Sequence, residues 1–307
     1  MLVIWVLALL SVVVLSWAQE WRTEIRLAAN FREERQCRRL AEAGVYYALA
    51  KLVAAKAAEQ KPMAFLGGTP PAPDPWNGDQ RRHLLELPGG LAEVRVADEG
   101  GKINLNQAPG KVLATLFSAL DISADKWRVM VESIEDWRQP GSQPRPFGAK
   151  SDYYLGLDPP YPAKNNPFDT VEELSWVRGF TDSTLPARLS KYLTVQGVSQ
   201  QINLNTAPLE VLLSLGFPPE LAQALIQERE VAPLQSQTVL PRLTANLQLQ
   251  PLLQNLSFNS APFFTILATG MINNKDGARH TIKVIVGLTQ KEDLPWKFVY
   301  WAEDYPD

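Results

Sequence analysis

The sequence predicts an α+β fold, in which a long N-terminal helix packs on a small antiparallel sheet and a large, mostly helical insertion separates the strands. Three observations support this prediction. The first 18 residues carry no charge and run without a break into a charged segment that is compatible with a helix. Strand-like alternation occurs at residues 91–96 and again after residue 263. Between these strands a seven-residue motif occurs twice, and apolar residues at helical spacing follow each copy.

The N-terminal helix is predicted from its lack of helix-breaking residues. The first glycine is Gly44 and the first proline is Pro62, so the helix can continue to about residue 59. At 1.5 Å per residue, residues 1–18 span roughly 27 Å, close to the thickness of a bilayer core, and the whole helix about 90 Å. These lengths indicate a membrane anchor that continues into a rigid stalk. A cleaved signal peptide ending at Ala18 is the alternative, although no basic segment precedes the apolar run.

The charged half of this helix carries one narrow apolar stripe. The stripe consists of Leu40, Ala43, Tyr47, Ala50 and Ala54. Their spacing of three and four residues places them on one helix face, which we expect to pack on the chain's own domain or on neighbouring helices. The only cysteine, Cys37, excludes an intrachain disulfide, and we expect it to be an incidental small residue.

The strands are predicted at both ends of the part that follows the helix. Residues 62–88, which are rich in proline, are predicted to form a loop. The strands are expected at residues 91–96, 264–269, 281–286 and 297–301. The second and third of these flank a glycine-containing turn at residues 273–277 and should form a hairpin.

The repeated motif reads INLNQAP at residues 103–109 and INLNTAP at residues 202–208. Each copy should open a pair of helices joined by a short turn, with the second helices at residues 124–137 and 219–230. The proline suits the first helical turn, and Asn106, Asn205 or Thr206 can cap the exposed N–H groups. A third hairpin is expected at residues 169–180, where Thr170 and Glu173 form a capping-box pattern.

Paired helices after such a motif are similar to helix-hairpin-helix modules, which bind DNA phosphates through backbone N–H groups. The turns argue against that use here, because the first contains the carboxylate of Asp121 and the second contains Pro218 and Pro219, which lack N–H groups. A formal net charge of −3 also disfavours nucleic acid. No catalytic motif is present, and the two histidines show no metal-ligand spacing, so we expect no enzymatic activity.

Taken together, these features resemble the K-type minor pseudopilins of type II secretion (general secretion pathway protein K). The resemblance covers essentially the whole chain. It is carried by the apolar first helix, the doubled INLNxAP motif, and the segments YYLGLDPPY at 153–161 and FDTVEEL at 168–174. It implies a pilin-like domain, insertion in the bacterial inner membrane and a periplasmic C-terminal domain. It also implies a place at the tip of the pseudopilus, with I-type and J-type minor pseudopilins and the major pseudopilin as partners.

With this family in mind, the chain divides into four parts. These are a transmembrane helix at 1–19, a stalk with the start of the pilin-like domain at 20–100, the helical insertion at 101–262, and the last strands at 263–307. The first acid is Glu20, and the absence of an earlier one fits a tip subunit, which has no neighbour above it to pair with a carboxylate in lipid. The chain starts inside the apolar run, so we expect the family's basic leader to lie upstream or the numbering to begin in the mature region. The arginines after Glu20 would, on charge alone, indicate the opposite topology.

The resemblance also implies a possible calcium site in the insertion. Calcium takes six to eight oxygen ligands, and the acids that could contribute are Asp136, Asp152, Asp158 and Asp169. Gln139 and Lys150 lie where further acids would be expected, and the four acids could equally be loop and helix caps. Two functions from other classes stay open: a membrane-anchored DNA-binding protein that uses the two hairpins, and a tethered structural protein unrelated to secretion.

Overall fold

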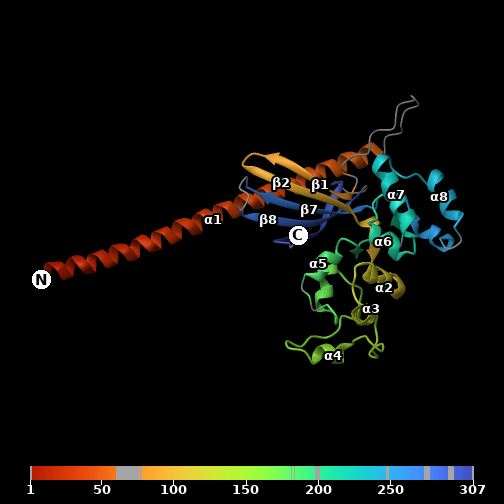
Figure 1. Cartoon of the computed structure of the whole chain (residues 1–307), viewed down its shortest axis with the longest axis horizontal. Coiled ribbons are helices and arrows are strands. Elements are labelled where there is room, and N and C mark those ends of the chain that lie inside the picture. The colour runs from red at the N-terminus through yellow and green to blue at the C-terminus, as the bar shows by residue number, and fades with distance from the viewer. Residues whose placement is uncertain are drawn as a thin grey trace.

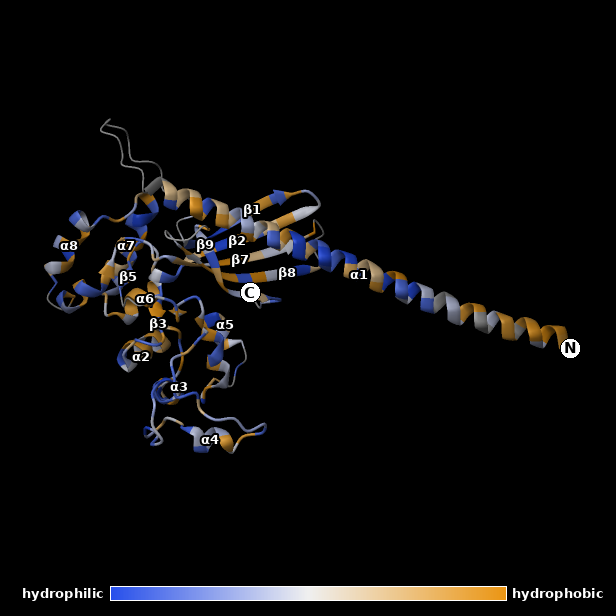
Figure 2. Cartoon of the chain, turned by 180° about the vertical axis from the view of Figure 1, so that it is seen from behind, coloured by the Kyte–Doolittle hydropathy of each residue, from blue (hydrophilic) through white to orange (hydrophobic). Residues whose placement is uncertain are grey.

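One continuous helix, α1 (Leu2–Glu59), forms the spine of the molecule. The computed structural model describes residues 2–59, 76, 78–180, 182, 184–197, 201–246, 249–272, 277–289 and 294–305. Figure 1 shows the first half of α1 projecting far beyond the rest of the chain, while its second half lies across a sheet. Figure 2 shows that the projecting half changes from apolar to polar towards the sheet. The predicted unbroken rod is therefore confirmed across its apolar and charged parts.

The sheet under α1 has five strands in the order β1-β2-β7-β8-β9, and every neighbouring pair is antiparallel. The strands are β1 (Asp79–Leu87), β2 (Gly90–Asp98), β7 (Phe263–Met271), β8 (Arg279–Leu288) and β9 (Trp296–Glu303). The predicted strands correspond to β2, β7, β8 and β9, whereas the turn residues 273–276 lie outside the described residues. The prediction of a loop up to residue 88 was wrong at β1. This edge strand is mostly polar, and its conformation depends on the ladder with β2 rather than on its own pattern.

The helix face that meets the sheet is not the predicted one. Of the expected stripe only Leu40 is buried, while Ala43, Tyr47, Ala50 and Ala54 are exposed. The buried face is formed by Cys37, Leu40, Ala41, Gly44, Val45, Ala48, Leu49 and Leu52. This face is buried in place of the predicted stripe because it offers more large aliphatic side chains to the core. It also has small residues where the backbones of helix and sheet approach closely.

Two glycines show how close this approach is. A Cβ on Gly44 would lie 2.8 Å from Cγ2 of Val94 on β2, and a Cβ on Gly270 of β7 would overlap the carbonyl oxygen of Cys37. Cys37 itself is fully buried and donates from Sγ to the carbonyl oxygen of Ala278 at 2.9 Å. Cys37 is therefore part of the buried contact between α1 and the sheet.

The segment between β2 and β7 is mostly helical, and Figure 1 shows it extending to one side of the sheet. Its first half contains the 3₁₀ helix η1 (Glu99–Gly101), β3 (Ile103–Asn104), α2 (Gly110–Ala119), α3 (Ala124–Arg138), α4 (Ser151–Leu155), the 3₁₀ helix η2 (Val171–Trp176), α5 (Leu185–Leu189) and β4 (Leu193–Thr194). Its second half contains β5 (Ile202–Asn203), α6 (Leu209–Ser214), α7 (Pro219–Val231), α8 (Ser236–Thr244), the 3₁₀ helix η3 (Gln250–Asn255) and β6 (Leu256–Ser257).

Two hydrophobic cores result from this arrangement. One lies between α1 and the sheet, and the other lies within the insertion, where both repeats contribute to one cluster. The first helices of the two hairpins, α2 and α6, pack against each other. The predicted third hairpin is instead η2. Its capping box between Thr170 and Glu173 is present, but only six residues are wound, as a 3₁₀ helix, before Gly179 adopts a positive φ of 98°.

Candidate functional site

The first candidate site is the projecting half of α1. Its described large apolar side chains from Leu2 to Phe31 are at least 49% exposed. Over its first part the helix is long and apolar enough to cross a membrane. Beyond that part, Trp21, Ile25 and Phe31 stay exposed on a segment that also carries many charges. Such side chains on a bare rod are typical of a surface that lipid or neighbouring helices cover.

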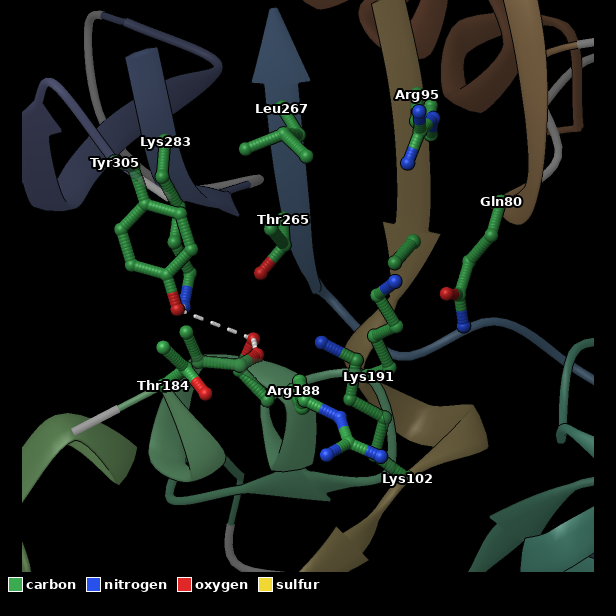
Figure 3. A pocket seen from close by; sticks show the side chains of 13 residues that line it. Gln80, Arg95, Lys102, Thr184, Arg188, Lys191, Thr265, Leu267, Lys283 and Tyr305 are labelled. Carbon is green, nitrogen blue, oxygen red and sulfur yellow. Dashed lines mark hydrogen bonds between the residues drawn. The ribbon is translucent and has the colours of Figure 1, made fainter. Parts of the chain in front are cut away.

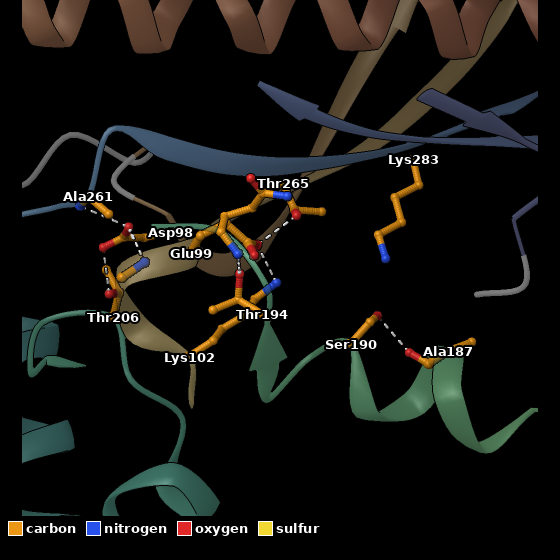
Figure 4. A network of polar contacts seen from close by, with 12 residues as sticks. Asp98, Glu99, Lys102, Ala187, Ser190, Thr194, Thr206, Ala261, Thr265 and Lys283 are labelled. Atoms are coloured by element: carbon orange, nitrogen blue, oxygen red, sulfur yellow. Dashed lines mark hydrogen bonds and ion pairs between the residues drawn. The ribbon is translucent and has the colours of Figure 1, made fainter. Parts of the chain in front are cut away.

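The second candidate site is the joint that fixes the insertion to the sheet (Figure 4). Asp98, the last residue of β2, is 2% exposed, and its carboxylate accepts four hydrogen bonds. One oxygen accepts from the backbone N–H groups of Gly100 at 2.8 Å and Ala261 at 3.1 Å. The other accepts from the side chains of Asn203 at 2.8 Å and Thr206 at 2.9 Å. The second repeat is thereby tied directly to the end of a sheet strand.

A buried ion pair lies beside Asp98 in the same joint. Lys102 and Glu99 are almost completely buried, and Nζ of Lys102 lies 2.5 Å from Oε1 of Glu99. The same Glu99 oxygen accepts from the hydroxyl of Thr265 on β7 at 2.7 Å. Burial raises the pKa of Asp98, while its four donors act in the opposite direction. The joint therefore combines two buried acids with matched donors, and loss of any partner would cost free energy because it would leave a buried polar group unsatisfied.

The two repeats are also equivalent in their hydrogen bonds. In each copy the first asparagine, Asn104 or Asn203, accepts from the backbone N–H of the second, Asn106 or Asn205. The second asparagine then bonds both backbone groups of a distant residue. For Asn106 this residue is Phe168, with distances of 2.7 and 2.9 Å. The predicted helix-capping role of the second asparagine was wrong: the cap residue of each following helix is the proline, which makes no side-chain cap bond.

In each repeat an arginine donates hydrogen bonds to backbone carbonyl groups of the motif, and the sequence analysis predicted neither of these two residues. Arg138, at the end of α3, donates to the carbonyl oxygens of Leu105 and Ala108. Arg229, near the end of α7, donates to the matching carbonyl oxygens in the second copy, each at 2.8 Å. The available signal was a basic residue near the end of each second helix. That position also suits the helix dipole, so the sequence did not distinguish the two roles.

The four acids predicted as calcium candidates occupy separate places. Asp136 on α3 is fully buried, Asp152 on α4 and Asp158 after it are exposed, and Asp169 contacts Lys164 at 2.8 Å with 85% of its side chain exposed. No group of three or more acidic, histidine or cysteine side chains placed to hold a metal occurs among the described residues. The structure thus does not gather these acids around one point.

Cations of the chain already surround the buried acid. The guanidinium of Arg145 lies 2.5 Å from Oδ1 of Asp136, and its backbone N–H donates to Oδ2 at 2.9 Å. The ammonium of Lys150 donates to the carbonyl oxygens of Asp136 and Gln139, both at 2.6 Å, and to Oδ1 of Asn165 at 3.1 Å. An ammonium enclosed by oxygens does not fit a calcium ion at the same place. Calcium binding by these acids stays a prediction.

The turns of the two hairpins each contain a residue with left-handed backbone. Asp121, between α2 and α3, has a positive φ of 60°, and Gly216, between α6 and α7, one of 95°. The resemblance of these pairs to helix-hairpin-helix modules stays a prediction, and no contact among the described residues favours the DNA-binding alternative.

The fold and the exposed rod together define the class of the protein. An apolar helix continues without a break as the spine of a helix-on-sheet domain, and a helical insertion is fixed to one end of that sheet. This is the arrangement of a membrane-anchored, pilin-like protein with an enlarged head.

Comparison with known proteins shows what the chain is similar to within this class. Residues 91–198 match the family model described as "Type II secretion system (T2SS), protein K". The fold is similar to a chain in the crystal structure of the GspK-GspI-GspJ complex from the type 2 secretion system of enterotoxigenic Escherichia coli. The TM-score is 0.59 at 18% identity, over 94% of this chain and 98% of that chain. No curated protein matches the sequence. The family model thus matches the part of the chain from β2 to the end of the first repeat unit, in agreement with the resemblance noted in the sequence, and the likeness to the solved structure is one of fold.

Proposed function

We propose that this chain is a non-enzymatic minor pseudopilin at the tip of the type II secretion pseudopilus, where it nucleates assembly for protein export across the outer membrane. Its proposed partners are I-type and J-type minor pseudopilins and then the major pseudopilin. Residues 1–19 anchor it in the bacterial inner membrane before assembly. Residues 20–100 and 263–307 supply the periplasmic stalk and sheet, and residues 101–262 supply the head.

The observation that carries the proposal is the state of α1. Its first part is exposed and apolar, and residues 1–19 contain no acid. A filament subunit needs a helix that is soluble in lipid and that can also pack among similar helices. An acid near its start would need a partner on the subunit above, and a subunit with nothing above it has no such partner. The rod thus fits the first position of a helical bundle.

The joint supports the second half of the proposal. Four hydrogen bonds to Asp98 and the Glu99–Lys102 pair hold the insertion at one end of the sheet. A head held by these contacts cannot swing aside to admit another subunit. We infer that its bulk blocks addition at this end and that the filament grows from the other.

Partner binding tests the proposal directly. The tagged full chain is co-expressed with I-type and J-type minor pseudopilins and purified in detergent, and we expect all three to elute together. The variant I25S/F31S removes two exposed apolar side chains from the stalk, so it should retain less of both partners. The variant V231S/L294S changes two equally exposed apolar side chains elsewhere and should retain them fully. Elution of the wild-type chain alone in the presence of both partners would refute the assembly role.

Position in the filament is tested separately. Gold labels on a tag in the insertion should mark one end of isolated pseudopili in electron micrographs. Labels distributed along the filaments would contradict the tip assignment without affecting the partner assignment. Alkaline phosphatase fused after residue 305 should be active, because the proposed topology places that end in the periplasm.

A further inference from the structure

A basic cavity lies on the face of the sheet that is turned away from α1 (Figure 3). It has a volume of about 230 Å³ and lies between the sheet strands and α5 of the insertion. Its apolar walls are contributed by Ala97 of β2, Leu267 of β7 and Ala187 of α5. None of its 13 lining residues is acidic, whereas five of them are cationic: Arg95, Lys102, Arg188, Lys191 and Lys283.

Three of the five cations are paired with acids outside the cavity. Arg95 lies 2.6 Å from Glu93, Lys102 lies 2.5 Å from Glu99, and Lys283 lies 2.6 Å from Glu172. The hydroxyl of Tyr305, which also lines the cavity, donates to the same Glu172 oxygen at 3.0 Å. These pairs hold three of the lining side chains in place.

The other two cations, Arg188 and Lys191, form no ion pair or side-chain hydrogen bond with any described residue. Both are exposed, and Figure 3 shows their side chains in the same part of the cavity as that of Lys102. Both also border a second hollow that contains Asp121, Asp125 and Asp182. No ion pair joins either cation to these acids among the described residues. Hydrogen bonds from Thr184 and, after them, the charge of Arg188 lower the pKa of Asp182, but no described acid is hydrogen-bonded to the guanidinium itself, which can bind one from a ligand.

Gln80 supplies a polar group on the opposite wall. Its residue has a positive φ of 65°, at the irregularity where the register of β1 against β2 shifts. A non-glycine residue in this region is strained. Figure 3 shows the amide of Gln80 directed into the same space as Lys102 and Lys191.

From this geometry we propose that the cavity binds the carboxylate of an acidic segment from a protein partner. A volume of about 230 Å³ is below the roughly 300–1,000 Å³ of sites for drug-sized ligands, and it suits one side chain or one chain end. Arg188 matches a carboxylate with two parallel N–H groups, Lys191 adds a second charge, and the apolar walls accommodate the methylene stem. The cavity lies on the globular part rather than on the projecting rod, so a lipid headgroup is not its ligand.

The test uses the full chain in detergent at low salt and peptides that carry an uncharged fluorophore. One peptide, blocked at both ends, has a single glutamate between alanines and serines. A second has glutamine in its place, and a third has glutamine and a free carboxy-terminus. We expect the glutamate peptide to bind at least tenfold more tightly than the blocked glutamine peptide. Binding of the third peptide shows whether a chain end is also accepted.

The variant R188Q/K191Q removes the two unpaired cations and should weaken the glutamate peptide at least tenfold. Both residues are exposed, so its melting temperature should stay within about 2 °C of wild type. The control K111Q/R128Q removes the same charge from exposed positions outside the cavity and should bind normally. Three results would overturn the proposal: equal binding of both blocked peptides, an equal loss in the control, or glutarate competing at the affinity of the peptide itself. No pseudopilin partner enters this assay, so its outcome is independent of the proposed secretion role.

Discussion

Replacing Asp98 with alanine tests whether the joint holds the head on the sheet. The substitution removes the acceptor of four hydrogen bonds at a site that is 2% exposed. The hydroxyl of Thr206 can rotate to another acceptor, but the N–H groups of Gly100, Ala261 and Asn203 point in fixed directions. A buried donor without a partner costs about 1–3 kcal/mol. Three such donors at the lower limit give a loss of about 3 kcal/mol in the free energy of unfolding.

The measurement is thermal unfolding of the full chain in detergent, followed by tryptophan fluorescence. At an unfolding entropy of about 2.1 cal/mol/K per residue, about 3 kcal/mol lowers the melting temperature of a chain of this size by about 5 °C. The control Asp125→Ala removes an exposed acid and should lower it by less than about 2 °C. Hydrogen exchange should accelerate around Gly100 and Ala261, which lose their common acceptor. A melting temperature for Asp98→Ala within about 2 °C of wild type would show that the joint does not hold the head, and the reasoning would fail.

Three further predictions concern packing, pH and calcium. Gly44→Ala should lower the melting temperature, because overlap with Val94 at 2.8 Å outweighs the roughly 0.5–1 kcal/mol gain in helix propensity; an increase would show that the contact yields. Burial alone would raise the pKa of Glu172, but the ammonium of Lys283 lowers it below its ordinary value of 4.5. The loss in free energy of unfolding caused by Glu172→Gln, relative to wild type, should therefore be constant above about pH 4.5. It should become smaller as pH falls through the lowered pKa, and a loss that becomes larger in acid would contradict this. Calcium at millimolar concentration should shift the melting temperature by less than about 1 °C, because cations of the chain already surround Asp136; a larger shift with heat of binding in titration calorimetry would support the calcium site predicted from the sequence.

Local patterns accounted for much of the fold. The absence of glycine before Gly44 and of proline before Pro62 predicted α1, and the repeated motif predicted the helix pairs that follow it. These features depend on propensity and periodicity over short stretches, which the sequence displays directly. The edge strand β1 was missed because its conformation depends on hydrogen bonds to β2 and not on its own alternation.

The candidate sites also divide into one that local sequence predicted and one that depends on tertiary contacts. The projecting part of α1 could be predicted from the apolar run alone, because its helix does not depend on contacts with the rest of the fold. The joint at Asp98 did not follow, since its donors Asn203 and Thr206 lie more than 100 residues away in the chain. In the sequence, Asp98 starts a glycine-containing turn, which is an ordinary place for an acid.

The sequence by itself determined that this protein has a long uninterrupted helix with an apolar start, strands at both ends of its globular part and a duplicated helical motif between them. Only the tertiary structure decided which face of α1 is buried, because Gly44 and Gly270 permit a close approach that a hydrophobic stripe does not reveal. Only the tertiary structure brought Arg188, Lys191 and Gln80 to one cavity, since they come from α5, the turn after it and a bulged edge strand. Periodicity reports the neighbours of a residue along the chain, whereas contacts across the fold depend on how separate elements pack.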